Sequence, residues 1–397
     1  MNNANTMGVP VLLAHPFRPF FLLAGIYAIV VVLGWIAFLF GGWPIPLGWS
    51  PLQWHSHEML YGFVAAAIAG FVLTAMTNWT GAHPLQGLGL LSLLLLWLAG
   101  RLAMWFAGWL PGWLVAVVDL AFLPVLAIYM AHVLISHQNR RNLVLVAVLT
   151  LLFIGNLYMQ IGFATGKTGL LQTGQLLGLD LVTVLIVVIA GRIIPAFSSN
   201  WLRSNGHNPE AVKTFRWLEF ASLGSVVLLL LVDWLPLPIQ AASAAALLAG
   251  AANGVRLAGW AGWKTAREPL LWILHLAYLW VVVALLLRGA SAFTDTIAPT
   301  VWQHALGVGG IGTLILGVMT RVAVGHTGRP LQLQRFAVFA YIAITGAAVL
   351  RLLAAAGLLD YRLGVSLSAL SWVVAFSLFV LLYAPVLAAP RPDGRPG

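Results

Sequence analysis

The sequence predicts an all-α protein, a polytopic membrane bundle of about twelve transmembrane helices. Of its 397 residues, 61% are hydrophobic and only 8% are charged, whereas a soluble domain carries about 25% charged residues. The apolar residues form continuous runs of about 20, the length that crosses the hydrocarbon core as a helix. A transmembrane β-barrel would show shorter segments of alternating polarity. We therefore expect a single integral membrane domain over residues 1–397.

Twelve apolar segments are predicted to span the membrane, and short loops rich in Gly, Pro and Asn join them. The segments are residues 19–40, 54–77, 85–108, 112–135, 141–164, 170–192, 212–233, 237–259, 269–289, 297–320, 333–356 and 364–387. Short similarities between the second, sixth and tenth spans are compatible with a repeat of three four-helix groups, and the shared apolar composition of membrane spans is the alternative explanation. The polar, uncharged stretch Met1–Pro10 precedes the first apolar run, so no cleavable signal peptide is expected.

Charge gives the expected orientation, because loops rich in Lys and Arg stay in the cytoplasm. With the N-terminus inside, most basic residues lie at the inner side, and Lys167, Arg288, Arg351 and Arg362 lie toward the outer side. Both termini are therefore expected in the cytoplasm of a bacterial inner membrane. The same rule explains the excess of 20 Lys and Arg over 10 Asp and Glu, so no nucleic-acid partner is expected.

Histidine stands at the head of the second and the tenth span, in Trp54–Met59 and in Trp302–His304. An ionisable side chain in a membrane is costly and marks a candidate functional site, and neutral imidazole is the commonest metal ligand. We therefore take His55, His57 and His304 as candidate ligands of haem or copper near the outer face. On a helix, residues two apart point about 200° apart. One of the first two then faces the bundle and the other a loop or a second centre, unless both precede the helix and converge.

Packing offers an alternative for each of these features. A histidine at a helix end can be an interfacial residue with a polar tip. Glu58 is either an acceptor for an imidazole N–H or a helix N-terminal carboxylate that the helix dipole favours. The glycines between His304 and Gly312 allow the close approach of a neighbouring helix or of a flat cofactor.

A second candidate metal set lies toward the inner side. His15 and His326 flank the predicted spans at that face, and His275 lies about two turns inside the ninth span. Arg321 and Arg329 follow the tenth span and would neutralise anionic groups such as haem propionates or lipid phosphates. Anchoring of the span ends by positive charge is the alternative.

The interiors of the predicted spans hold few charged residues, chiefly Arg101, Asp119 and Asp180. Both aspartates are candidates for a proton path or for structural pairing. The chain has no cysteine, which excludes disulfides, cysteine-ligated iron–sulfur clusters, thiolate haem and cysteine nucleophiles.

Together these motifs resemble the NnrS family. The resembling segments are His15–Phe21, Trp54–Met59, Gly191–Pro195 and Gly317–Leu331, so the likeness runs from near the N-terminus to the eleventh span. The resemblance implies a bacterial inner-membrane protein that contains haem b and copper. It also implies a role in the response to nitric oxide and nitrosative stress, often beside denitrification genes. Nitric oxide is then the expected small-molecule ligand, and the reaction and the electron donor stay open.

A more distant likeness is architectural. Haem–copper oxidases and nitric-oxide reductases have a subunit I of twelve spans in three four-helix arcs. The second and tenth spans of that subunit hold a low-spin haem through histidines, and here those spans carry His55, His57 and His304. This chain departs from the pattern elsewhere, because its sixth span has no histidine and its seventh has no His-His pair. The usual binuclear centre is therefore not encoded, and a haem between the second and tenth spans is the expectation that remains.

Two other functions stay open from the sequence. A membrane transporter or metal permease would use polar residues near the bilayer midplane and broken helices, and the span interiors of this chain hold few charged residues. A non-catalytic haem-based sensor of nitric oxide, or an assembly partner of denitrification enzymes, would show the same histidines as an enzyme.

Overall fold

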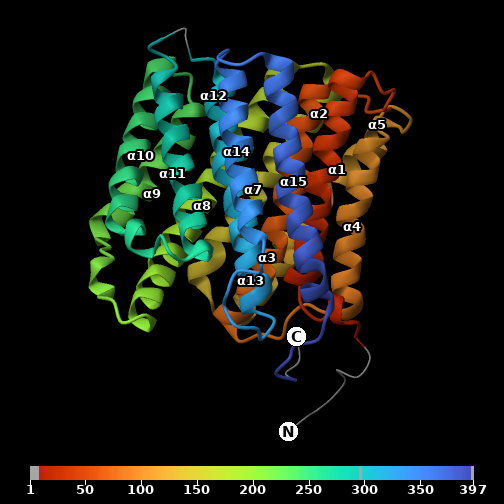
Figure 1. Ribbon diagram of the computed structural model, residues 1–397. Helices are drawn as coiled ribbons and strands as arrows, with labels where there is room; N and C mark the ends of the chain where they lie inside the picture. Colours follow the sequence, from red (N-terminus) through yellow and green to blue (C-terminus); the bar gives the residue numbers. More distant parts are fainter. Residues whose placement is uncertain (1–8, 295–296, 395–397) are drawn as a thin grey trace. The chain divides into compact units, whose positions relative to one another are not determined.

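Every regular element that the structure describes is a helix. The computed structural model describes residues 9–294 and 297–394 (Figure 1). Within these ranges, eleven helices are long and apolar enough to cross a membrane. The predicted all-α class is confirmed, and the chain is a multi-pass membrane protein.

Each predicted span corresponds to a helix, and most ends agree within a few residues. The spans are α1 (Phe17–Gly41), α2 (Pro51–His57) continued by η2 (Glu58–Val64) and α3 (Ala65–Thr80), α4 (Gly87–Trp105), α5 (Gly112–Leu120) with α6 (Phe122–Ser136), α7 (Leu143–Thr165), α8 (Thr168–Ser204), α9 (Arg216–Asp233), α10 (Ile239–Gly259), α11 (Pro269–Ala290), α12 (Pro299–His304) continued by η6 (Ala305–Gly312) and α13 (Thr313–Gly325), α14 (Ala337–Ala355) and α15 (Tyr361–Ala388). A short 3₁₀ turn at Val11–Leu13 precedes the first span, and three more lie in connections, at Arg140–Asn142, Pro209–Ala211 and Gly262–Thr265.

Two of the predicted ends are wrong. The sixth span was expected to end at residue 192, but α8 continues through Pro195 to Ser204. A proline removes one backbone N–H, and a membrane helix tolerates this where neighbouring groups satisfy the freed carbonyl. The tenth span likewise continues past Thr320 to Gly325.

Helix α9, the seventh predicted span, differs from the other eleven in its charged residues. It carries Arg216, Glu219 and Asp233 within 18 residues. Glu219 forms an ion pair with Arg256 of α10, and Asp233 lies 2.5 Å from Arg288 of α11. Its acidic side chains are therefore neutralised by neighbouring helices, which lowers the cost of placing them in a membrane.

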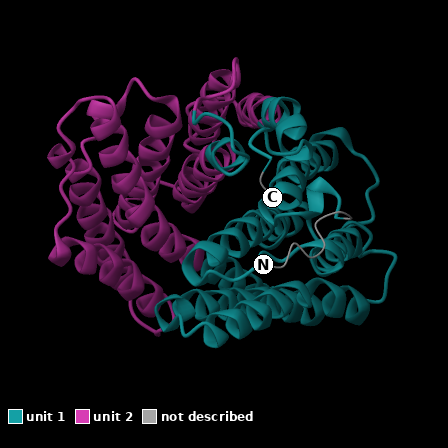
Figure 2. Ribbon diagram, turned by 90° about the horizontal axis from the view of Figure 1, so that it is seen from below, with its two compact units in different colours: residues 1–178, 321–331, 376–397 teal, residues 179–320, 332–375 magenta. Residues whose placement is uncertain are grey.

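The helices form two compact units (Figure 2). Unit 1 comprises residues 1–178, 321–331 and 376–397, and unit 2 comprises residues 179–320 and 332–375. Helices α8, α13 and α15 pass from one unit into the other along the chain.

Within unit 1, the first span and the end of the last span lie at the same end of the bundle. The Arg18 guanidinium at the start of α1 donates to the backbone oxygens of Leu387 and Ala389 at the end of α15, at 2.5 and 3.0 Å. An even number of membrane crossings must separate two helix ends that meet in this way. Eleven crossings would put them on opposite sides, so this contact supports α9 as the twelfth span.

Within unit 2, helix packing explains most of the glycines after His304. A Cβ at Gly309 would lie 2.6 Å from the ring of Trp280, and one at Gly312 would lie 2.5 Å from Trp372. These glycines therefore admit tryptophan rings of neighbouring helices. Gly307 differs, because a Cβ there would touch nothing within 4 Å.

The second and tenth spans share an irregularity. Each begins as a short α-helix, passes into a π-helix at Glu58–Val64 or Ala305–Gly312, and then continues as an α-helix. Both π segments begin directly after a histidine that the sequence analysis singled out. Segments of π-helix are rare and often lie at functional sites.

Candidate functional site

Unit 1 contains a cluster of four buried charged side chains, which we call the charge cluster: His57, Glu58, Arg101 and Asp119. The side chains of His57, Glu58 and Asp119 are 0% exposed, and that of Arg101 is 3% exposed. A buried charge is tolerated only where it is paired and hydrogen-bonded. Each of these four side chains must therefore have an oppositely charged, hydrogen-bonded partner.

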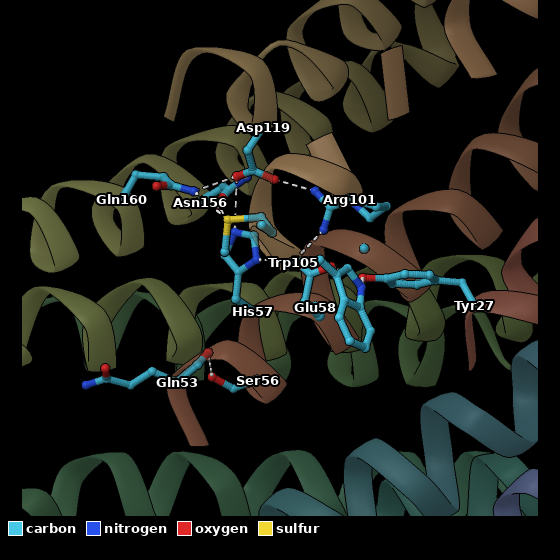
Figure 3. Close-up of polar contacts among 12 residues, drawn as sticks. Tyr27, Gln53, Ser56, His57, Glu58, Arg101, Trp105, Asp119, Asn156 and Gln160 are labelled. Carbon is cyan, nitrogen blue, oxygen red and sulfur yellow. Dashed lines mark hydrogen bonds and ion pairs between the residues drawn. The ribbon is translucent and has the colours of Figure 1, made fainter. Parts of the chain in front are cut away.

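The charge cluster forms a closed ring in which cations and anions alternate (Figure 3). Arg101 Nη1 donates to Glu58 Oε1 at 2.6 Å, and Arg101 Nη2 donates to Asp119 Oδ1. On the other side of the ring, His57 Nδ1 lies 2.8 Å from Glu58 Oε1 and His57 Nε2 lies 3.1 Å from Asp119 Oδ2. Each carboxylate thus bridges the guanidinium and the imidazole.

The hydrogen bonds around His57 require the doubly protonated ring. Asn156 Nδ2 donates to Asp119 Oδ2 at 2.9 Å, which fixes the orientation of the amide. The Asn156 Oδ1 atom then faces His57 Nε2 at 2.8 Å. Both imidazole nitrogens face acceptor oxygens, so both must donate. The cluster then holds two cations and two anions with no net charge, and neither nitrogen of His57 offers a lone pair to a metal in this arrangement.

Three further side chains complete the hydrogen bonds of the cluster. Tyr27 of α1 donates its hydroxyl hydrogen to Glu58 Oε2. Trp105 Nε1 donates to the Tyr27 hydroxyl at 3.2 Å, and Gln160 Nε2 donates to Asp119 Oδ2 at 2.7 Å. The network therefore joins α1, the α2–η2 span, α4, α5 and α7 within unit 1.

The local sequence explains how the head of the second span enters the cluster. Ser50 caps α2 by accepting a hydrogen bond from the Gln53 amide at 3.3 Å, and Pro51 fits the first turn because its missing N–H needs no partner there. Gly62 lies about one helical turn beyond Glu58 and leaves room for the guanidinium of Arg101. A Cβ at this position would lie 2.8 Å from the Tyr27 ring and 2.9 Å from Arg101 Nη1.

His55 points away from the charge cluster. Its ring stacks on Trp35 of α1, with the centroids 4.2 Å apart and the planes at 18°. Of the two arrangements that the sequence left open for His55 and His57, the structure shows the divergent one. Glu58 accepts a hydrogen bond from the imidazole of His57, as one of its two predicted roles required.

A second group of histidines lies at the other end of the spans in unit 1. His15 and His326 flank the ring of Phe17, with centroid distances of 6.0 and 5.7 Å. Burial and the Arg18 guanidinium lower the pKa of His15 to about 4, and burial and Arg391 lower the pKa of His326. Both rings are therefore neutral at pH 7. The Nδ1 atom of His15 is buried and has no hydrogen-bond partner among the described residues.

The two arginines predicted near this group belong to the same unit. Arg321 begins the segment 321–331 of unit 1, and Arg329 Nη1 donates to the backbone oxygen of Thr327 at 3.4 Å. Arg391 Nη1 donates to the backbone oxygen of His326 at 3.1 Å. Cationic side chains therefore adjoin the His15–His326 pair.

The other two candidate histidines lie in unit 2. His304 Nδ1 donates to the Thr300 backbone oxygen at 2.7 Å, which leaves the lone pair on Nε2 available. His275 Nε2 lies 2.9 Å from Ser198 Oγ, and its buried Nδ1 has no partner in the described part of the chain. The structure thus brings His15 and His326 together and places His275 in the other unit. The meeting of His304 with His55 or His57 stays a prediction.

The donor chemistry of these histidines suits them as ligands of haem or copper. A neutral imidazole nitrogen with a free lone pair is the donor that both metals accept, and His15 Nδ1 and His304 Nε2 meet this description. Within residues 9–294 and 297–394, no group of three or more His, Asp or Glu side chains is placed to hold a metal ion. Any metal site in the described residues would therefore use at most two such ligands in the arrangement seen, or ligands of another kind.

Both intramembrane aspartates form ion pairs with arginine. Asp119 pairs with Arg101 in the charge cluster. Asp180 Oδ1 lies 2.6 Å from Arg288 Nη1, and the same guanidinium holds Asp233. Of the two roles predicted for these aspartates, structural pairing is the one that the structure shows.

Tyr27, Asn156 and Gln160 were not among the residues predicted from the sequence. The two amides had a usable signal, since Asn156 and Gln160 stand four residues apart on one face of an otherwise apolar span. Tyr27 had none, because a single tyrosine in an apolar helix is common and only tertiary packing places its hydroxyl on Glu58.

Comparison with known proteins identifies the chain at the level of a family. The family model described as NnrS protein matches residues 11–391. This range includes the whole charge cluster and all the candidate histidines. No curated protein sequence matches the chain.

Proposed function

Since this chain belongs to the NnrS family, we propose that it binds haem b and copper in the bacterial inner membrane and acts in the response to nitric oxide. The match over residues 11–391 carries the proposal, because it contains the motifs whose resemblance implies this function. The neutral histidines supply the donor chemistry that both cofactors need.

For haem, we propose His304 and, on the second span, His55 as the residues whose imidazoles would hold the iron. His304 keeps the lone pair of Nε2 because Nδ1 donates to the Thr300 oxygen. The charge cluster holds both nitrogens of His57, which favours His55 of the two histidines on the second span. Arg321 follows His304 on the same continuous span by about 25 Å, so Arg321 and Arg329 would instead neutralise anionic groups at the inner histidines, such as lipid phosphates or the propionates of a haem bound there. When bound, haem iron supplies a site where nitric oxide binds.

For copper, we propose the pair His15 and His326. Both imidazoles are neutral at pH 7, both flank Phe17, and His15 Nδ1 is buried with no partner among the described residues. The hydrogen bond from Arg391 to the His326 oxygen fixes the backbone at this point. His275 is the alternative ligand in unit 2.

In this proposal the charge cluster positions the head of the second span. His57 and Glu58 are held by groups from four other helices, so the backbone that also carries His55 has little freedom to shift. A ligand that keeps its place without a bound cofactor loses less conformational entropy on binding.

An optical spectrum of the purified, detergent-solubilised protein tests the haem assignment. We expect a b-type spectrum after reduction with dithionite, a positive pyridine haemochrome assay, and a spectral change when nitric oxide is added. His304→Ala and His55→Ala should lose most of the bound haem. The matched control is His137→Ala, a histidine exposed at the end of α6, which should keep it.

Two outcomes would contradict the proposal in different ways. A b-type spectrum that survives His304→Ala and is lost in His15→Ala would move haem to the inner histidines. Well-folded protein from haem-replete cells without haem would overturn the cofactor assignment and favour a permease. Consumption of nitric oxide at steady state with an electron donor separates an enzyme from a sensor, which binds stoichiometrically and stops.

A further inference from the structure

Arg351 is a buried cation without a carboxylate partner. It lies near the end of α14 in unit 2 and is 7% exposed. Its buried Nε and Nη1 atoms have no hydrogen-bond partner among the described residues, and no ion pair joins it to an Asp or Glu there. The Tyr361 ring lies 5.9 Å from the guanidinium carbon, which leaves the charge in place. A buried charge requires a paired, hydrogen-bonded partner, and Arg351 lacks one.

Four other arginines in the spans have what Arg351 lacks. Arg101, Arg256 and Arg288 each pair with a carboxylate. Arg18 donates to two backbone oxygens. The chain therefore satisfies these guanidinium groups with its own oxygens, whereas an acceptor for Arg351 has to come from another molecule.

Arg351 belongs to the surroundings of His304. Helices α12 and α14 pack against each other within unit 2, and the guanidinium is close enough for its charge to act on the His304 ring. That ring is half-buried, and its Nδ1 donates to the Thr300 oxygen. Gly307, on the same span, is also half-buried, and a Cβ there would meet nothing within 4 Å. Open space therefore adjoins the span beside His304.

The two side chains together select the kind of ligand. The guanidinium of Arg351 donates to anionic oxygen atoms, whereas Nε2 of His304 offers a lone pair, which repels an anion and binds a metal. A free anion would satisfy the arginine and oppose the histidine. A haem carries both an iron and carboxylates. Arg321 cannot serve the same carboxylates, because it lies about 25 Å from His304 along the span.

We propose that Arg351 binds a propionate carboxylate of the haem that His304 would hold. The inference rests on the proposed function and deepens it, because it names the residue that recognises the anionic edge of the porphyrin. A guanidinium matches a carboxylate with two parallel hydrogen bonds. The phosphate of an anionic lipid offers Arg351 the same oxygen chemistry, so the experiment has to separate the two sources.

Titration of the full-length, haem-free protein in nanodiscs of zwitterionic lipid tests the proposal. The two ligands are haemin and haemin dimethyl ester, whose carboxylates are esterified and uncharged. We expect the parent protein to bind haemin about tenfold or more tighter than the ester. Arg351→Met should abolish this preference, and Arg351→Lys should keep part of it. The matched control is Arg362→Met, at an exposed position of unit 2, which should keep all of it.

Thermal unfolding separates ligand binding from a structural role. Methionine has a similar unbranched chain but no charge, so Arg351→Met removes an unpaired buried cation. Without haem, we expect this variant to melt at or above the temperature of the parent protein. With haem bound, the parent should gain more stability than the variant. The haem of Arg351→Met should also have a more negative reduction potential, because the lost cation disfavoured the ferric state.

Several outcomes would overturn the proposal. These are equal affinity of the parent for haemin and its ester, a preference that survives Arg351→Met, a preference lost equally in Arg362→Met, and a haem-free Arg351→Met that melts well below the parent. Nanodiscs that contain phosphatidylglycerol test the lipid source. If they stabilise the haem-free parent but not Arg351→Met, and remove the preference for haemin, the partner is a lipid phosphate.

The two proposals fail in different ways. Equal binding of haemin and its ester overturns the role of Arg351 and leaves haem binding intact. Absence of binding of either porphyrin, to the parent and to every variant, overturns the proposed haem site and this inference together.

Discussion

At the scale of single residues, the charge cluster shows how this chain keeps four ionisable groups inside a membrane. The ring of Arg101, Glu58, His57 and Asp119 carries no net charge when His57 is doubly protonated. Each ion loses several kcal/mol of hydration on burial, and its partners offset that loss only while the ring is complete. The removal of one member should therefore cost far more than the removal of an exposed ion pair.

Asp119→Asn tests this argument. The substitution keeps the shape of the side chain but leaves the charges of Arg101 and His57 with one carboxylate between them. We expect a loss of stability of about 3–5 kcal/mol, measured as a clear fall in the apparent melting temperature in detergent. The matched control is Asp393→Asn, which breaks the exposed Arg391–Asp393 pair, whose N–O distance is 2.6 Å.

Exposed ion pairs contribute about 0–1 kcal/mol, so the control should melt close to the parent protein. If Asp119→Asn and Asp393→Asn melt at the same temperature, the charge cluster does not stabilise the fold. In that case His57 need not be doubly protonated.

Sequence reasoning found the charged members of the cluster but not their pairing. His57, Glu58, Arg101 and Asp119 were visible because a charge in an apolar span stands out. Their contacts join positions 43 and 62 residues apart, such as Glu58 with Arg101 and His57 with Asp119. Only the packing of the helices decides such partners, and no local pattern records it.

At the scale of helices, the second span is shaped by the π-helix that follows His57. The length of each apolar run decided where the spans lie, which is why their predicted ends were close. The π-helices Glu58–Val64 and Ala305–Gly312 and the continuation of α8 through Pro195 depend on neighbouring helices. Sequence periodicity could not reveal them.

Gly62→Ala tests how closely the π-helix of the second span packs. The added Cβ would lie 2.8 Å from Tyr27 and 2.9 Å from Arg101, so the guanidinium must shift and its bonds must lengthen. Overpacking of this kind costs about 1–3 kcal/mol, which thermal unfolding in detergent measures. Gly346→Ala in α14 is the control, because its Cβ would meet nothing within 4 Å. That control should be neutral or stabilising by up to about 1 kcal/mol. A stable Gly62→Ala with an unstable Gly346→Ala would contradict the packing described.

At the scale of the whole molecule, the topology rests on whether α9 crosses the membrane. The Arg18 hydrogen bonds to Leu387 and Ala389 require an even number of crossings, while eleven helices are apolar enough to cross without help. Helix α9 supplies the twelfth because its acidic residues pair with Arg256 and Arg288. Which side holds the termini comes from the distribution of Lys and Arg and stays a prediction.

Reporter fusions test both parts of this topology. An alkaline phosphatase that is active only outside the cytoplasm should be active in the loop at Leu235–Leu237, between α9 and α10, and inactive after Gly206 and at the C-terminus. If α9 did not cross, the fusion at Leu235–Leu237 would be inactive like the one after Gly206.

Glu219→Lys supplies the matched variant, because it breaks the pair with Arg256 and places two cations side by side. We expect it to reduce the external activity at Leu235–Leu237 while the fusion after Gly166, which precedes α8, keeps its own. Full external activity in that variant would show that α9 inserts without its ion pair, and the apolar residues of the helix would then suffice.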